Sequence, residues 1–154
     1  TGLGYRRLGV ALNVDLDLRS NHLQWGHFLW RNAHLPRVQR VAPHSAEELE
    51  REPFLAWVRK EKPDVVISPL NDCLHWLRAG GYRVPEDIGF ASMSTARSNP
   101  DHASGIDERP ERIGVAAIDQ LTSQMLRNER GLPDDRRFIF VEGEWLPGLT
   151  VRPQ

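Results

Sequence analysis

Asn71 and Asp72 are two neighbouring side chains suited to binding a polar small molecule. They follow the apolar run 65–67, which is typical of a buried strand, and they open a stretch to Ala79 that we expect to be helical. An amide donates and accepts hydrogen bonds, a carboxylate accepts them from hydroxyl groups, and a helix N-terminus offers free backbone N–H groups. The pair therefore predicts a hydroxyl-binding position, with helix capping as the alternative or additional role.

The remaining reactive side chains do not form a pattern typical of an enzyme or a metal site. The six histidines contain no His-Glu-x-x-His arrangement, and His22 and His27 are five residues apart, which places them on different faces of a helix. The sequence has no phosphate-binding glycine loop, no dinucleotide-binding fingerprint and no G-x-S-x-G nucleophile motif. We therefore expect no enzymatic activity, no metal and no cofactor.

Composition indicates one ordinary globular domain. The 154 residues are 40% hydrophobic and 27% charged with a net charge of -1, which disfavours disorder and disfavours nucleic-acid binding by this chain alone. The single cysteine, Cys73, permits no internal disulfide, and no apolar run approaches the ~18 residues that a membrane span needs. The N-terminus lacks both an initiating Met and a signal-peptide pattern, so we expect a fragment or a processed chain that is cytoplasmic and without a membrane partner.

Short apolar runs alternate with amphipathic stretches along the chain. We expect strands over 8–13, 38–41, 65–67 and 88–92, and a terminal hairpin of 137–141 with 144–151. We expect helices over 19–32, with its aromatic side chains packed on the sheet, over 71–79, over 110–126, and from Ser45, where Glu48 completes a capping box. The alternation predicts an α/β fold with a mainly parallel, doubly wound sheet. Ligands of such sheets bind beyond the carboxyl ends of the strands, here 13–19, 68–72 and 92–95.

Four segments, in this order, resemble the effector domain of the LacI/GalR family of transcriptional regulators. They are Gly4–Val10 (GYRRLGV), Lys62–Ile67 (KPDVVI) followed by Asn71-Asp72, Gly81–Ile88 (GYRVPEDI), and Ile106–Gly114 (IDERPERIG). The resemblance implies a periplasmic-binding-protein-like fold in which this chain supplies the second subdomain and a crossover helix. Residues 1–154 would then be the C-terminal portion of an effector-binding and dimerisation domain, without the DNA-binding helix-turn-helix and most of the first subdomain.

The resemblance also implies a set of ligand contacts. Asn71 and Asp72 resemble the family's sugar-hydroxyl binders, and an arginine that forks onto the ligand is expected near the first helix, where Arg19 and His22 are the candidates. Ser94 stands where the family typically carries an aspartate. The carboxylate that would accept hydrogen bonds from neighbouring sugar hydroxyls is therefore missing at this position. Glu108 resembles a residue that reaches into the cleft, and its alternative is a solvated charge at a helix N-terminus.

For the protein as a whole, the resemblance implies a ligand-sensing and dimerisation region of a LacI-type DNA-binding regulator that responds to a sugar or a related small molecule. Trp76 and Leu77 resemble the helix through which family members form homodimers, and the alternative is that Trp76 packs on the sheet. DNA would be reached only through the missing N-terminal module. The helix 110–126 would have lost its packing partner, which favours dimerisation or segment exchange. The alternative function is a solute-binding protein of a transport system, which has the same fold.

Overall fold

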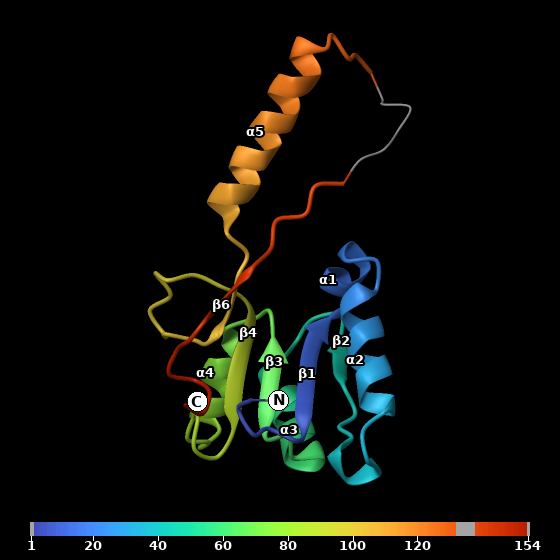
Figure 1. The fold of residues 1–154 in the computed structure, drawn as a ribbon. Helices are drawn as coiled ribbons and strands as arrows, with labels where there is room; N and C mark the ends of the chain where they lie inside the picture. The colour runs from blue at the N-terminus through green and yellow to red at the C-terminus, as the bar shows by residue number, and fades with distance from the viewer. Residues whose placement is uncertain (1, 132–137, 154) are drawn as a thin grey trace.

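The structure is a computed structural model that describes residues 2–131 and 138–153. Its centre is a six-stranded sheet in the order β2-β1-β3-β4-β5-β6 (Figure 1). Neighbouring strands run parallel from β2 to β5, and β6 is antiparallel to β5. The prediction of a mainly parallel α/β fold is confirmed. The strands are β1 (Leu8–Asn13), β2 (His44–Ala46), β3 (Val65–Ser68), β4 (Gly89–Thr95), β5 (Gly105–Asp107) and β6 (Glu144–Leu146). The helices are α1 (Val14–Arg19), α2 (Leu23–Ala33), α3 (Arg51–Glu61), α4 (Asp72–Ala79) and α5 (Pro110–Leu126), with a 3₁₀ turn at Arg37–Gln39.

The main hydrophobic core lies between one face of the sheet and the helices α3 and α4. Successive strand residues point to opposite faces, so Val66 and Phe90 face this core while their neighbours face away. Each fully buried side chain of this size contributes about 1.5–3 kcal/mol through removal from water. The buried helical residues are Phe54, Leu55, Trp57 and Val58 of α3 and Cys73, Leu74 and Leu77 of α4.

A smaller core on the opposite face holds both ends of the chain. Tyr5, Val65 and Val151 are buried together there. Gly89 permits the approach of Tyr5, because a Cβ at this glycine would lie 2.3 Å from the Tyr5 hydroxyl oxygen. The same hydroxyl accepts a hydrogen bond from the backbone N–H of Arg152 at 2.9 Å, and the Arg152 guanidinium lies 4.7 Å from the centre of the Tyr5 ring.

Two of the predicted elements before α3 are wrong. The strand expected over 38–41 is replaced by the 3₁₀ turn, and β2 begins at His44. Ser45 lies inside β2 and caps no helix; α3 begins at Arg51, with Pro53 in its first turn, where the missing N–H costs no intrahelical bond.

The helix expected over 19–32 corresponds to α2, which begins only at Leu23, and the preceding helix α1 was not expected. Asn21 and His22 adopt left-handed backbone angles, φ 52° and 61°, and these end α1 and start α2. No residue of α2 is fully buried: Trp25 and Phe28 are half-buried, and Trp30 is 67% exposed, so only part of its aromatic surface is covered.

The terminal hairpin is also wrong, although its second strand exists. β6 pairs with β5 through Gly105↔Leu146, Ile106↔Trp145 and Asp107↔Glu144, and β5 was not expected. Residues 138–143 form no strand, and residue 137 lies outside the described residues. The structure therefore contains a hairpin whose connection includes the whole of α5.

Helix α5 has the predicted bounds and extends away from the sheet (Figure 1). It has no buried residue, and much of its apolar surface is exposed. The exposed apolar side chains of α5 are Ile113, Val115, Ile118, Leu121, Met125 and Leu126. None of the helices in the described part of the chain is long and apolar enough to cross a membrane.

Arg7 ties the start of β1 to the C-terminus of α3. Its guanidinium donates to the backbone oxygens of Val38, Glu61 and Lys62, two of which belong to the end of α3. Replacing it (Arg7→Met) keeps the apolar stem and removes all three bonds, so we expect a loss of about 2 kcal/mol in the free energy of unfolding, measured with urea. Arg6→Met is the control, since the Arg6 side chain is exposed; equal losses in both variants would contradict this role.

His44 makes stability depend on pH. Its ring stacks on Trp57 with centroids 5.5 Å apart, its Nε2 is buried without a partner among the described residues, and burial lowers its pKa. In the unfolded chain His44 takes up a proton near the ordinary histidine pKa of about 6.5. In the folded chain the buried ring takes up this proton only at a lower pH. The contribution of the neutral His44 ring to the free energy of unfolding is thus complete above about pH 6.5. It is lost as the pH falls from there through the lowered pKa of the folded chain. We expect His44→Phe to flatten the fall in Tm between about pH 7 and 5, whereas His27→Phe, at an exposed position, leaves the slope unchanged.

Candidate functional site

A hollow of about 530 Å³ lies at the carboxyl edge of the sheet, where parallel strands commonly present ligand-binding residues. It is bounded by the start of α4, the end of β4, the following loop and the segment that leads into α5. We call it the edge hollow. Its lining residues are Asn71, His75, Ser94, Thr95, Ala96, Ser98, Asn99, Pro100, Asp101, Asp107, Glu108 and Pro110.

Asn71 lines the edge hollow with an unsatisfied side chain. It precedes α4, yet its side chain makes no capping hydrogen bond, so the capping alternative is not realised for this residue. Its Oδ1 is buried and has no hydrogen-bond partner within the described residues. A buried acceptor without a donor costs about 1–3 kcal/mol, so this oxygen is a natural place for a ligand donor. Asp72 is exposed at the first position of α4 and does not line the hollow.

Ser94 and Glu108 come together from different parts of the chain. The Ser94 hydroxyl, near the end of β4, donates to Glu108 Oε2 at 3.0 Å, and Glu108 lies between β5 and α5. Both side chains are exposed and both line the edge hollow. The structure therefore brings three of the predicted contacts, Asn71, Ser94 and Glu108, into one site.

Arg19 and His22 lie elsewhere, at the junction of α1 and α2, and neither lines the edge hollow. Arg19 is exposed. The Nδ1–H of His22 donates to Oδ2 of Asp17 at 2.5 Å, and Asp17 is only 3% exposed. The other oxygen of Asp17 accepts the Trp25 backbone N–H at 3.3 Å, so this carboxylate joins the two short helices.

The sequence reasoning did not identify His75 and Asp101 as part of this edge, whereas Asn13 begins one of the predicted strand ends. His75 Nε2 lies 3.2 Å from Asp101 Oδ2, and Arg78 Nη1 lies 3.0 Å from Asp101 Oδ1, so two cation-forming side chains of α4 hold the loop that walls the hollow. His75 and Arg78 are three residues apart on a helix, which is a readable signal that they share a face. Asn13 ends β1 at the same edge, and its Oδ1 is also buried without a partner in the described part of the chain.

The predicted interface residues behave differently from each other. Leu77 is fully buried in the main core, so its side chain is not available to a second subunit and this assignment is corrected. Trp76 is half-buried and its ring lies 5.7 Å from that of Phe54, which leaves part of it at the surface of α4.

Cys73, the single cysteine of the chain, is fully buried in the main core. Burial raises the pKa of the Cys73 thiol to about 11, which keeps it protonated and unreactive at neutral pH. Among residues 2–131 and 138–153, no three His, Cys, Asp or Glu side chains are arranged to hold a metal ion. The arrangement offers hydrogen-bond donors and acceptors for binding.

The fold agrees with comparisons against known structures. The chain is similar to a LacI-family transcriptional regulator from Silicibacter pomeroyi (19% identity, TM-score 0.70), with 99% of this chain and 48% of that chain covered. It is similar to a LacI-family regulatory protein from Corynebacterium glutamicum (20% identity, TM-score 0.67), with 99% and 60% covered. A PurR-family regulator from Vibrio parahaemolyticus RIMD 2210633 gives 12% identity and a TM-score of 0.70, with 99% and 58% covered.

The chain thus spans about half the length of these solved relatives. No curated protein matches the sequence. The family described as periplasmic binding protein-like domain matches residues 1–149, which is nearly the whole chain. The chain therefore belongs to the periplasmic binding protein-like domain family and has the fold seen in the effector-binding domains of LacI-family regulators.

Proposed function

We propose that this chain is the ligand-sensing region of a LacI-type transcriptional regulator and that the edge hollow holds one side of its effector. The observation that supports this most is the buried, unpartnered Oδ1 of Asn71 beside the Ser94 hydroxyl and the Glu108 carboxylate. An amide oxygen, a hydroxyl and a carboxylate together suit a ligand that carries several hydroxyl groups, such as a sugar. Asp72, Arg19 and His22 do not line the edge hollow, and they stay candidate contacts because they follow the ends of β3 and β1 at the carboxyl edge of the sheet.

The site works by binding, and we propose no catalytic step. A ligand that contacts both Ser94 and Glu108 bridges the end of β4 and the segment that leads into α5. It changes the balance between two arrangements of these parts only if it binds them with different affinity. The effect on DNA then passes through a DNA-binding module outside this chain, in the cytoplasm. A transport-type solute-binding protein shares this fold, but the three solved relatives described above are named as regulators.

The ligand proposal is tested by thermal shift with sugars, sugar acids and phosphorylated sugars. A ligand at ten times its Kd stabilises the folded state by about 1.4 kcal/mol, which raises the Tm by roughly 3–5 °C for a chain of this size. We expect Asn71→Ala to abolish the rise and Gln120→Ala, which removes an amide from α5, to preserve it. If no carbohydrate raises the Tm, or if both variants respond equally, a sugar site at the edge hollow is ruled out.

We also propose that α4 takes part in a homodimer through the exposed part of Trp76. Sedimentation velocity over a hundredfold range of concentration should show a dimer whose dissociation constant rises at least tenfold in Trp76→Ala. Met125→Glu, on the exposed stripe of α5, is the comparison variant. A chain that stays monomeric throughout contradicts the dimer, and a dimer broken by Met125→Glu alone assigns the contact to α5.

A further inference from the structure

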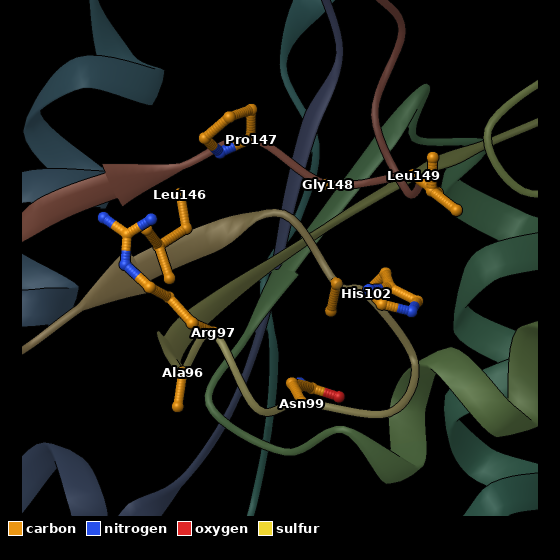
Figure 2. Close-up of a pocket in the computed structure, with 9 residues that line it drawn as sticks. Ala96, Arg97, Asn99, His102, Leu146, Pro147, Gly148 and Leu149 are labelled. Atoms are coloured by element: carbon orange, nitrogen blue, oxygen red, sulfur yellow. The ribbon is translucent and has the colours of Figure 1, made fainter.

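A second hollow, of about 410 Å³, lies between the loop after β4 and the segment after β6 (Figure 2). The loop contributes Arg97, Asn99 and His102, and the facing segment runs from Leu146 to Leu149. We call it the loop pocket. It shares Ala96 and Asn99 with the edge hollow, but its other lining residues are its own: Arg97, His102, Ala103, Leu146, Pro147, Gly148 and Leu149.

The walls of the loop pocket are fixed by hydrogen bonds. The backbone N–H of Leu149 donates to the His102 carbonyl at 2.8 Å, and that of Gly148 donates to the Ser104 hydroxyl at 3.0 Å. Gly148 is required for this close approach, since a Cβ there would lie 2.2 Å from the His102 oxygen. A pocket whose walls are already ordered loses little conformational entropy when a ligand binds.

The chemistry of the loop pocket is that of an apolar surface with a cation at its rim. Ala103 and Leu146 are buried and form the bottom of the pocket. Leu149 is 69% exposed and forms an apolar side wall that is open to solvent. Among the described residues that line it there is no carboxylate. The Asn99 amide is already engaged, because its Nδ2 donates to Thr95 Oγ1 and its Oδ1 accepts the Asp101 backbone N–H.

Arg97 is the polar group free to change partner. Its side chain is 71% exposed, and within the described part of the chain its one polar contact is a long one of 3.5 Å with Glu144 Oε1. Figure 2 shows the guanidinium beside Leu146, at the opposite end of the pocket from His102. An incoming anion at this rim can therefore replace Glu144 without breaking a strong interaction.

We propose that the loop pocket binds a small carboxylate that carries an apolar ring or chain. The planar guanidinium of Arg97 pairs with the carboxylate, and the apolar part of the ligand packs on Leu146, Pro147 and Leu149. A phosphate group fits this pocket less well, because most of its wall is apolar and one exposed cation cannot replace the hydration of a doubly charged anion. This site is separate from the proposed sugar site, and neither proposal depends on the other.

Benzoate is the probe for this proposal, and benzamide is its uncharged counterpart. Titration of the full chain, followed by ¹H–¹⁵N NMR, should shift the backbone amides of 96–103 and 146–149, excluding proline, with saturation in the millimolar range. We expect benzamide to bind at least fivefold more weakly, and Arg97→Gln to weaken benzoate at least fivefold. Arg59→Gln, at an exposed position on α3, is the matched control and should change nothing.

A second pair of variants separates charge from shape. Leu149 is exposed, so Leu149→Asp and Leu149→Asn both remain folded and differ only in charge. Benzoate should bind the Asp variant several-fold more weakly than the Asn variant. The proposal is overturned if benzamide matches benzoate, if Arg97→Gln binds as the unmodified chain does, or if the shifts are scattered over the whole surface.

Discussion

Trp57 lies against the bare backbone of Gly9, where a Cβ would come within 2.7 Å of the indole carbon Cη2. The same indole donates its Nε1–H to the Ala42 carbonyl at 2.7 Å and stacks on His44. These contacts fix the distance of α3 from β1 and β2 and its orientation over them. Phe54 then connects Trp57 to Trp76 of α4 through ring contacts of 5.8 and 5.7 Å. The position of α4 determines where Asn71 meets the edge hollow, so the geometry of the candidate site depends on the contact between Trp57 and Gly9 at the other end of this series of rings.

Elements whose sequence signal is local could be predicted from the sequence. β1 and α5 have the expected bounds, because an apolar run and an amphipathic repeat with a first-turn proline are complete within their own residues. β5 was missed because it is three residues long and gains its stability from β6, whose partner residues lie about forty positions later. The pairing of β5 with β6 also displaced the expected terminal hairpin. Such contacts between distant segments leave no periodicity in the sequence.

In the candidate site, too, the residues with a local sequence signal could be predicted, and those that depend on contacts between distant segments could not. Asn71 and Ser94 lie at the carboxyl ends of predicted strands and could be placed at one edge by the topology of a parallel sheet. Glu108 was expected near the cleft only through the family resemblance, because the strand that it follows, β5, was not predicted. The contribution of Asp101 depends on a loop that folds back onto α4, which only the three-dimensional arrangement reveals. Leu77 was misplaced because a helical stretch of eight residues does not show which face meets the sheet, and the structure turns this side chain into the core.

The hairpin of β5 and β6 has a mechanical consequence for α5. The helix of 17 residues, about 25 Å long at ~1.5 Å per residue, is joined to the sheet by this ribbon, in which three residue pairs are in register. The chain enters the helix at Arg109, whose left-handed φ of 57° marks a sharp change of direction. Because the helix is long and is attached at its base, a rotation of about 10° there would move its far end by roughly 4 Å. Glu108, which accepts the hydrogen bond of the Ser94 hydroxyl, directly precedes this change of direction at the base of the helix.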